Sequence, residues 1–329
     1  EGTSTEDLLR QLQDDPRILS AEPNYVQRLD DPDQTALDES TPQVAAALGL
    51  DSSDAAPSAP ASADASGTAA ADLSGYQWGC RNTGEVMVQE EAPPLAGFDI
   101  APPNWNQVGT TNAADVVDVV DTGVEYNHPE LAGIIGGMTS DTDRGGRYGI
   151  NVVPGMDPTD PMDDHYHGTH CAGIIASQWD GVGTSGVASG VQLVAVRVAG
   201  RQNTIESADT IRAYEYLAEA VDAGLPLRAI NNSWAGRPMS KAFSLAATKL
   251  GEKGAVTVIG SGNDAADVDK IPMTASVLAH NPYAVAVDAS DSSGQLASFS
   301  NYGVETTDVV APGMNIMSTV PLGRAAYAP

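Results

Sequence analysis

The clearest pattern along the chain is an alternation of short apolar runs with amphipathic stretches, beginning near residue 116. Five runs are rich in β-branched residues and have the length of buried strands: 116–120, 191–198, 255–259, 283–287 and 308–310. Between them, Ile211, Tyr214, Leu217 and Val221 recur at helical spacing, which predicts an amphipathic helix over 208–221. A second helix is predicted over 240–250.

This order of elements predicts the fold class. Strands that alternate with helices are typical of an α/β protein, and we predict a mainly parallel sheet with helices on both faces. Functional residues of such sheets gather at the carboxyl ends of the strands. Asp121 and Asn263 each follow an apolar strand closely, so both are candidates for a site at that edge.

Three regions differ in composition. Residues 1–30 contain a predicted helix over 5–12 and two possible strand pieces at 18–19 and 25–26, but so short a segment must pack on something larger. Residues 31–74 are rich in Ala, Ser, Asp and Pro and are predicted to be a disordered acidic linker. Residues 75–329 carry the globular pattern.

Charge and cysteine usage narrow the classes of partner. The chain has 44 Asp and Glu against 16 Lys and Arg, a net charge of −28. Nucleic-acid binding rests on basic residues that neutralise phosphates, so no nucleic-acid partner is expected. No apolar run approaches the roughly 18 residues of a membrane-spanning helix. Cys80 and Cys171 make no disulfide framework; the two could pair with each other, but we favour the interpretation as two separate thiols.

Two short segments carry residues typical of acid–base chemistry. Asp121 begins an Asp-Thr-Gly segment, and His167 begins a His-Gly-Thr-His segment that leads into small residues. A carboxylate beside a histidine orients the imidazole and stabilises its protonated form. An aspartic-protease dyad would need a second Asp-Thr-Gly, which the sequence lacks. Another alternative is a zinc hydrolase that uses His165, His167 and His170.

Further segments in the same order resemble one known family, the subtilisin-like serine endopeptidases. The segments are Asp-Thr-Gly-Val-Glu-Tyr-Asn-His-Pro-Glu-Leu at 121–131, His-Gly-Thr-His-Cys-Ala-Gly at 167–173, Asn-Asn-Ser-Trp at 231–234, Gly-Ser-Gly-Asn-Asp at 260–264, Phe-Ser-Asn-Tyr-Gly at 299–303 and Ala-Pro-Gly at 311–313. The resemblance covers roughly residues 76–329 and explains the histidines better than a zinc site does.

The resemblance implies a role for each matching residue. Asp121 would orient His167, which would act as general base and then general acid, and Asn263 would donate its amide to the developing oxyanion. Six residues would line the cleft for a protein or peptide substrate: Ser233, Trp234, Ala235, Gly260, Ser261 and Gly262. His170 and Cys171 are interpreted as structural, and His165 is expected to be solvated.

The resemblance also implies two accessory features and a location. Residues 14–26 look like the end of an inhibitory propeptide, whose tail would lie in the protein's own substrate cleft. A calcium site is implied as well, because calcium binds several oxygens. Its predicted ligands are Glu130, Gln178, Asp180, Val182, Thr184 and Gln77. The family's members imply secretion or a place in the lumen of the secretory pathway.

Two departures from the family pattern bear on function. The family's Gly-Thr-Ser segment, with the nucleophile, is expected a few residues beyond Pro329, so the 329 residues alone should be inactive. Asp118 stands where a small apolar residue is usual, and a buried carboxylate needs a partner. The leading hypothesis is therefore a serine endopeptidase whose serine lies outside these residues. The alternative is a non-catalytic binding or assembly module in a larger complex.

Overall fold

The computed structural model describes residues 4–13, 15, 18, 21–29, 77–80, 115–136, 145–188, 190–200, 203–236, 240–271, 273–322 and 327–328. The predicted linker over 31–74 lies outside the described residues. Cys80 and Cys171 are separate thiols, as predicted. No described helix has the length and apolar character needed to cross a membrane.

The helices and strands include those that the sequence pattern predicts from residue 116 on, and they add strands that it did not predict, among them Leu227–Asn232 at the centre of the sheet. In chain order they are α1 (Thr5–Gln13), β1 (Val26–Arg28), β2 (Val116–Asp121), β3 (Gly149–Asn151), α4 (His167–Ala176), β4 (Gln192–Arg197), β5 (Thr204–Glu206), α5 (Ser207–Asp222), β6 (Leu227–Asn232), α6 (Lys241–Glu252), β7 (Val256–Gly260), the 3₁₀ helix η2 (Thr274–Val277), β8 (Ala284–Ser290), β9 (Val309–Pro312), β10 (Ser318–Thr319) and β11 (Tyr327–Ala328).

The centre of the fold is a seven-stranded sheet with the order β3-β4-β2-β6-β7-β8-β9. Every neighbouring pair in it runs parallel. The α/β prediction is therefore confirmed, and the five predicted strands correspond to β2, β4, β7, β8 and β9. Predicted boundaries differ by one to three residues, because strand ends depend on hydrogen-bond partners that apolar runs do not encode.

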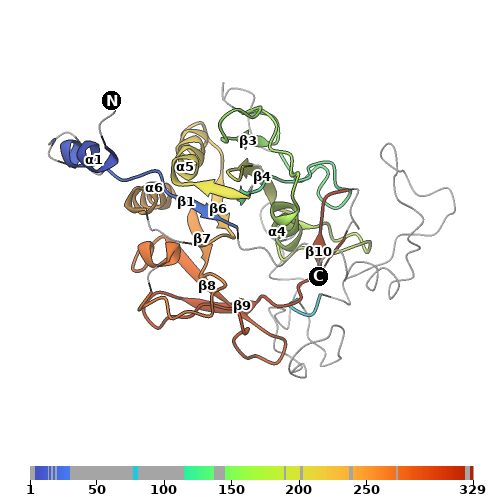
Figure 1. The fold of residues 1–329 in the computed structure, drawn as a ribbon. Helices are drawn as coiled ribbons and strands as arrows, with labels where there is room; N and C mark the ends of the chain where they lie inside the picture. Colours follow the sequence, from blue (N-terminus) through green and yellow to red (C-terminus); the bar gives the residue numbers. More distant parts are fainter. Residues whose placement is uncertain are drawn as a thin grey trace.

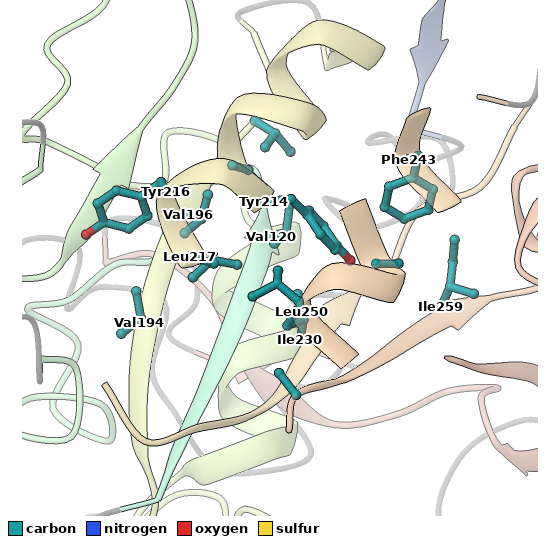
Figure 2. Close-up of a cluster of buried hydrophobic side chains, with 14 of the residues drawn as sticks. Val120, Val194, Val196, Tyr214, Tyr216, Leu217, Ile230, Phe243, Leu250 and Ile259 are labelled. Atoms are coloured by element: carbon teal, nitrogen blue, oxygen red, sulfur yellow. The ribbon is translucent and has the colours of Figure 1, made fainter. Parts of the chain in front are cut away.

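The larger core lies between the sheet and the pair α5 and α6, which cover one face (Figure 1). Tyr214 and Leu217 of α5 and Leu250 of α6 pack over Val120 and Ile230 of the strands (Figure 2). All five side chains are at most 1% exposed. These residues are the apolar face that the helical spacing predicts, and their burial fixes α5 and α6 against β2.

The opposite face of the sheet is covered by α4. Ala172 and Ala176 of α4 pack with Val119 of β2 and with Leu193 and Ala195 of β4. Small residues on α4 allow the helix axis to come close to the strands. Helices therefore cover both faces, and successive residues of β2 alternate between two separate cores.

The N-terminal segment packs on the globular part. β1 pairs antiparallel with β5, with Gln27 opposite Ile205, and Leu29 is buried in the larger core. A strand at 25–26 is thus found with a shift of one residue, whereas the strand piece at 18–19 was wrong at Ile18. The Ile18 amide donates to the Asp15 carbonyl at 2.9 Å, which is a turn contact, and Leu19 lies outside the described residues.

Candidate active site

The site centres on an Asp–His pair at the carboxyl end of β2. His167 Nδ1 lies 2.8 Å from Asp121 Oδ1, and that same oxygen accepts the Thr122 amide at 2.7 Å. The Asp121 side chain is fully buried, whereas 25% of the His167 side chain is exposed. The carboxylate therefore fixes one ring nitrogen of His167, while part of the ring remains accessible from solvent.

Two glycines allow α4 to begin against the end of β2. A Cβ on Gly168 would lie 2.0 Å from the Gly123 carbonyl oxygen and 3.1 Å from the Asp121 Cβ. Gly123 itself has φ +106°, a conformation that side chains rarely adopt. The Gly168 amide donates to Thr122 Oγ1 at 2.9 Å. The close approach of these two backbones is what brings His167 within hydrogen-bond distance of Asp121.

Asp163 ties both segments together and was missed by the sequence reasoning. Its Oδ1 accepts the Thr122 hydroxyl at 3.0 Å, and its Oδ2 accepts the Thr169 hydroxyl at 2.6 Å and the Thr169 amide at 3.0 Å. Burial raises the pKa of Asp163, and the donors from Thr169, His165 and Thr122 oppose that shift. The signal available in the sequence was the position of Asp163, four residues before the start of α4. The residues that Asp163 binds can be identified only from the fold.

The other histidines near α4 do not converge with His167. His165 is buried and stacks on Tyr166 with ring centroids 4.4 Å apart, so the expectation that it is solvated was wrong. Its amide donates to Asp163, which turns this segment inward. His170 Nε2 contacts the Ile316 carbonyl at 2.9 Å. Among the described residues the three histidines form no cluster suited to a metal, which removes the zinc alternative.

Cys171 lies one helical turn after His167, beside the pair. Its Sγ, a ring nitrogen of His167 and an Asp121 oxygen all lie within 4.8 Å of one another. Burial raises the pKa of the Cys171 thiol, and the charge of Asp121 raises it further, while a hydrogen bond from Ser233 opposes the shift. The thiol therefore stays protonated at neutral pH and is a poor nucleophile.

Of the predicted cleft residues, Ser233, Trp234 and Ala235 follow β6, the strand next to β2. Trp234 is buried and its Nε1 donates to the Val120 carbonyl at 3.0 Å, one residue before Asp121. The Ser233 hydroxyl exchanges hydrogen bonds with the Asn231 side chain at 2.9 and 3.1 Å. Ala235 is half-buried. This segment is thus fixed directly to the strand that carries the acid.

The second cleft segment follows β7 and carries the predicted oxyanion donor. Gly260 ends β7, Ser261 is buried, Gly262 has φ +111°, and Asn263 is exposed. The fully buried Asn301 holds this turn, because its backbone amide donates to the Gly262 carbonyl at 2.8 Å. Asn301 Oδ1 accepts the amides at 264 and 266, each at 2.9 Å. Asn301 was quoted only as part of a family segment, and its anchoring role was not predicted.

Asp118 on β2 is buried without support. It is 0% exposed, and neither carboxylate oxygen has a hydrogen-bond partner among the described residues. Burial raises the pKa of Asp118 well above its ordinary value of 3.8. Asp118 is therefore neither exposed to solvent nor hydrogen-bonded to a polar group among the described residues. It shares its face of the strand with Val116 and Val120, so it points into the larger core.

The predicted calcium ligands lie in one neighbourhood of the loop after α4. Gln77 exchanges two hydrogen bonds with the backbone of Ser185, at 2.8 and 2.9 Å. Gln178 Nε2 donates to the Pro129 carbonyl at 3.2 Å, next to the buried Glu130. Asp180 Oδ1 accepts the Val182 amide at 2.9 Å, and the Thr184 hydroxyl donates to Ser177. The predicted ligand atoms are oxygens, which calcium prefers. The hydrogen bond from Gln178 to Pro129 ties the loop that carries most of them to the residue before Glu130.

A buried carboxylate that holds a partly exposed histidine at the carboxyl edge of a parallel sheet resembles the acid–base half of a serine-protease site. Comparison with known proteins gives the family. The model of the subtilase family matches residues 113–328, and the chain belongs to this family.

Individual relatives agree with the family assignment. The thermophilic serine proteinase of Bacillus sp. (strain AK1) is 32% identical over 258 residues, which cover 77% of this chain and 53% of that protein. Subtilisin E of Bacillus subtilis (strain 168) is 32% identical over 71% of this chain and 55% of its own length. The chain spans about half the length of the curated relatives it matches.

The fold has a solved counterpart. The crystal structure of a cold adapted subtilisin-like serine proteinase superposes with a TM-score of 0.54 at 25% identity, and the match covers 76% of each chain. The fold prediction and the resemblance to subtilisin-like proteases are therefore confirmed.

Proposed function

We propose that the whole protein is a serine endopeptidase that cleaves peptide bonds through an acyl-enzyme, with its nucleophilic serine outside these 329 residues. The observation that carries the proposal is the 2.8 Å contact of His167 with the buried Asp121. A carboxylate without solvent contact holds the imidazole in one orientation and stabilises the imidazolium that forms during proton transfer.

The steps follow from this geometry. His167 removes the proton from the serine hydroxyl as the oxygen attacks the peptide carbonyl, and then gives that proton to the leaving amine. Water repeats the sequence on the ester and frees the carboxylic acid. Asn263, exposed on the turn that Asn301 holds, would donate to the oxyanion of each tetrahedral intermediate.

The test uses the full-length protein and a fluorophosphonate, which reacts with activated serines. We expect one labelled serine in the native protein and no labelling after His167→Ala. An unlabelled native protein that hydrolyses no peptide would contradict the proposal and would favour the non-catalytic module.

The N-terminal segment is proposed to be an inhibitory propeptide tail that occupies the protein's own cleft. Support comes from its antiparallel pairing with β5, the mode in which proteases bind extended peptides. Two further contacts extend the ladder, from the Ser207 amide to the Tyr25 carbonyl at 2.8 Å and from the Leu29 amide to the Asn203 carbonyl at 2.9 Å. Val198 and Ala199, which lead toward β5, both donate to the Asp121 carbonyl, so this ladder adjoins the Asp–His pair.

Calcium is proposed as a structural ion of the loop after α4. Glu130 and Asp180 would supply carboxylate oxygens, the carbonyls of Gln178, Val182 and Thr184 would add backbone oxygens, and Gln77 Oε1 keeps one lone pair beside its bond to Ser185. Such an ion would hold the loop against Glu130. A chelator should lower the melting temperature by several degrees in the native protein and by much less in Asp180→Ala. Equal melting with and without chelator would contradict the site.

On the same resemblance, the protein is proposed to act after secretion or in the lumen of the secretory pathway. A cell that expresses the full-length protein should release it into the medium.

A further inference from the structure

The strand that pairs with β5 places one buried side chain against a small pocket. Gln27 lies opposite Ile205 in the ladder, and only 8% of it is exposed. Its Nε2 donates to Thr274 Oγ1 at 2.9 Å, a bond between two buried side chains far apart in sequence. The pocket beside it is lined by Gln27 itself together with Ile205, Ser207, Thr210, Trp234, Ser240, Phe243 and Thr274.

The polarity of the pocket is set by Thr274. Its hydroxyl donates to the Gly236 carbonyl at 2.9 Å, and its amide donates to the same oxygen at 2.9 Å. A hydroxyl has one proton to give. Because that proton is directed at a carbonyl that can only accept, Thr274 Oγ1 presents a lone pair to the pocket. The group that enters must therefore be a donor.

The remaining walls offer no positive charge. Ile205, Trp234 and Phe243 are apolar and buried, and Trp234 and Phe243 pack together with ring centroids 5.6 Å apart. The Ser240 hydroxyl accepts the Phe243 amide at 3.2 Å, and the Thr210 hydroxyl donates to the Glu206 carbonyl at 3.4 Å. Among the described residues that line the pocket there is no Lys or Arg. A carboxylate in the place of the Gln27 amide would lose water without gaining a counter-charge.

We propose that Thr274 makes this pocket selective for a substrate residue whose side chain ends in a neutral hydrogen-bond donor, so that glutamine is preferred over glutamate and methionine. The inference rests on the proposed function, because it takes the strand beside β5 as the place of the substrate. Glutamate has the shape of glutamine but no proton to give at neutral pH, and methionine has its length but no donor.

The first test measures selectivity in the processed full-length protein. Peptide substrates with the sequence of residues 24–30 are made with Gln, Met or Glu at the position of Gln27. We expect kcat/KM to fall about fivefold from Gln to Met, the value of one neutral hydrogen bond, and on the order of a hundredfold from Gln to Glu. Thr274→Val, which keeps the shape and removes the acceptor, should bring Gln and Met within about twofold, whereas Thr274→Ser should retain the preference.

The second test needs no catalysis and uses the 329-residue chain itself. Gln27→Met and Thr274→Val should each lower the melting temperature by a few degrees, and the double variant should lower it by no more than the larger single change. Additive shifts would overturn the proposal, as would a Gln to Met ratio that Thr274→Val leaves unchanged. If no variant cleaves any peptide, the proposed function fails. The melting temperatures of the two single variants and the double variant still decide whether Thr274 binds Gln27.

Discussion

Two carboxyl groups on β2, at positions 118 and 121, are both fully buried, yet their surroundings differ in every other respect. Asp121 accepts the Thr122 amide and faces His167, and Asp163 fastens the backbone around it. Asp118 has no hydrogen-bond partner among the described residues and lies among the valines and leucines of the larger core. Burial alone therefore does not mark a functional acid; the donors arranged around it do.

The largest expected effect is on activity, and it should distinguish Asp121 from Asp118. Asp121→Asn in the full-length protein should lower kcat by about 10⁴-fold, because the amide presents the wrong partner to the imidazole. The matched change Asp118→Asn alters a residue that contacts neither His167 nor the cleft residues, and kcat should stay within about threefold. Peptide hydrolysis under saturating substrate measures both. Equal losses would mean that Asp118 belongs to the catalytic unit.

A smaller effect concerns stability and its dependence on pH. The folded-state pKa of Asp118 is raised above 3.8 by burial, so the folded chain keeps its proton while the unfolded chain releases it. Stability is then lost as pH rises from about 4 through the raised pKa, and levels off above it. Asp118→Ala removes this loss and should gain about 1–3 kcal/mol at pH 8, the cost of an unpaired buried polar group.

Urea unfolding at pH 4, 6 and 8 measures this difference. The gain from Asp118→Ala should shrink toward pH 4, because near the ordinary pKa of 3.8 the unfolded unmutated chain also begins to hold the proton. A gain of the same size at all three values would assign the effect to packing and not to the charge.

The smallest effect tests the outer support of Asp121. Thr122→Val keeps the shape of the side chain but removes its bond to Asp163 and the acceptor of the Gly168 amide. We expect a loss of about 1 kcal/mol in unfolding free energy and a modest fall in kcat. Thr210→Val loses the hydrogen bond from its hydroxyl to the Glu206 carbonyl at the start of α5. It provides a control for the loss of unfolding free energy that removal of a threonine hydroxyl causes by itself. A fall in kcat equal to that of Asp121→Asn would place Thr122 in the reaction itself.

Much of the fold could be predicted because its signals are local. The apolar runs that become β2, β4 and β7 are β-branched and short, and the apolar face of α5 repeats at helical spacing. The Asp–His contact followed from a resemblance carried by several segments. His165 was misassigned because its burial depends on how the fold packs the segment before α4, which the neighbouring residues in the sequence do not indicate.

The remaining parts of the site depend on contacts between distant residues. Asp163 and Asn301 each bind several backbone amides, and Thr274 meets a side chain 247 positions away. Asp118 stood out in the sequence as a carboxylate on an apolar strand. Only the structure shows that it is fully buried and that neither of its oxygens is hydrogen-bonded within the described residues.

Glu22 anchors the N-terminal segment to α6, in addition to the pairing of β1 with β5. Its two carboxylate oxygens accept the amides of Lys241 and Ala242 at the start of α6, at 3.0 and 3.1 Å. Asn24 similarly accepts the Ala208 amide in α5 and donates to Glu206. A cut after residue 29 would leave these anchors in place, together with the ladder between β1 and β5. The severed piece should dissociate slowly, with a lifetime that shortens in high salt, because the bond at α6 is an anion at a helix N-terminus.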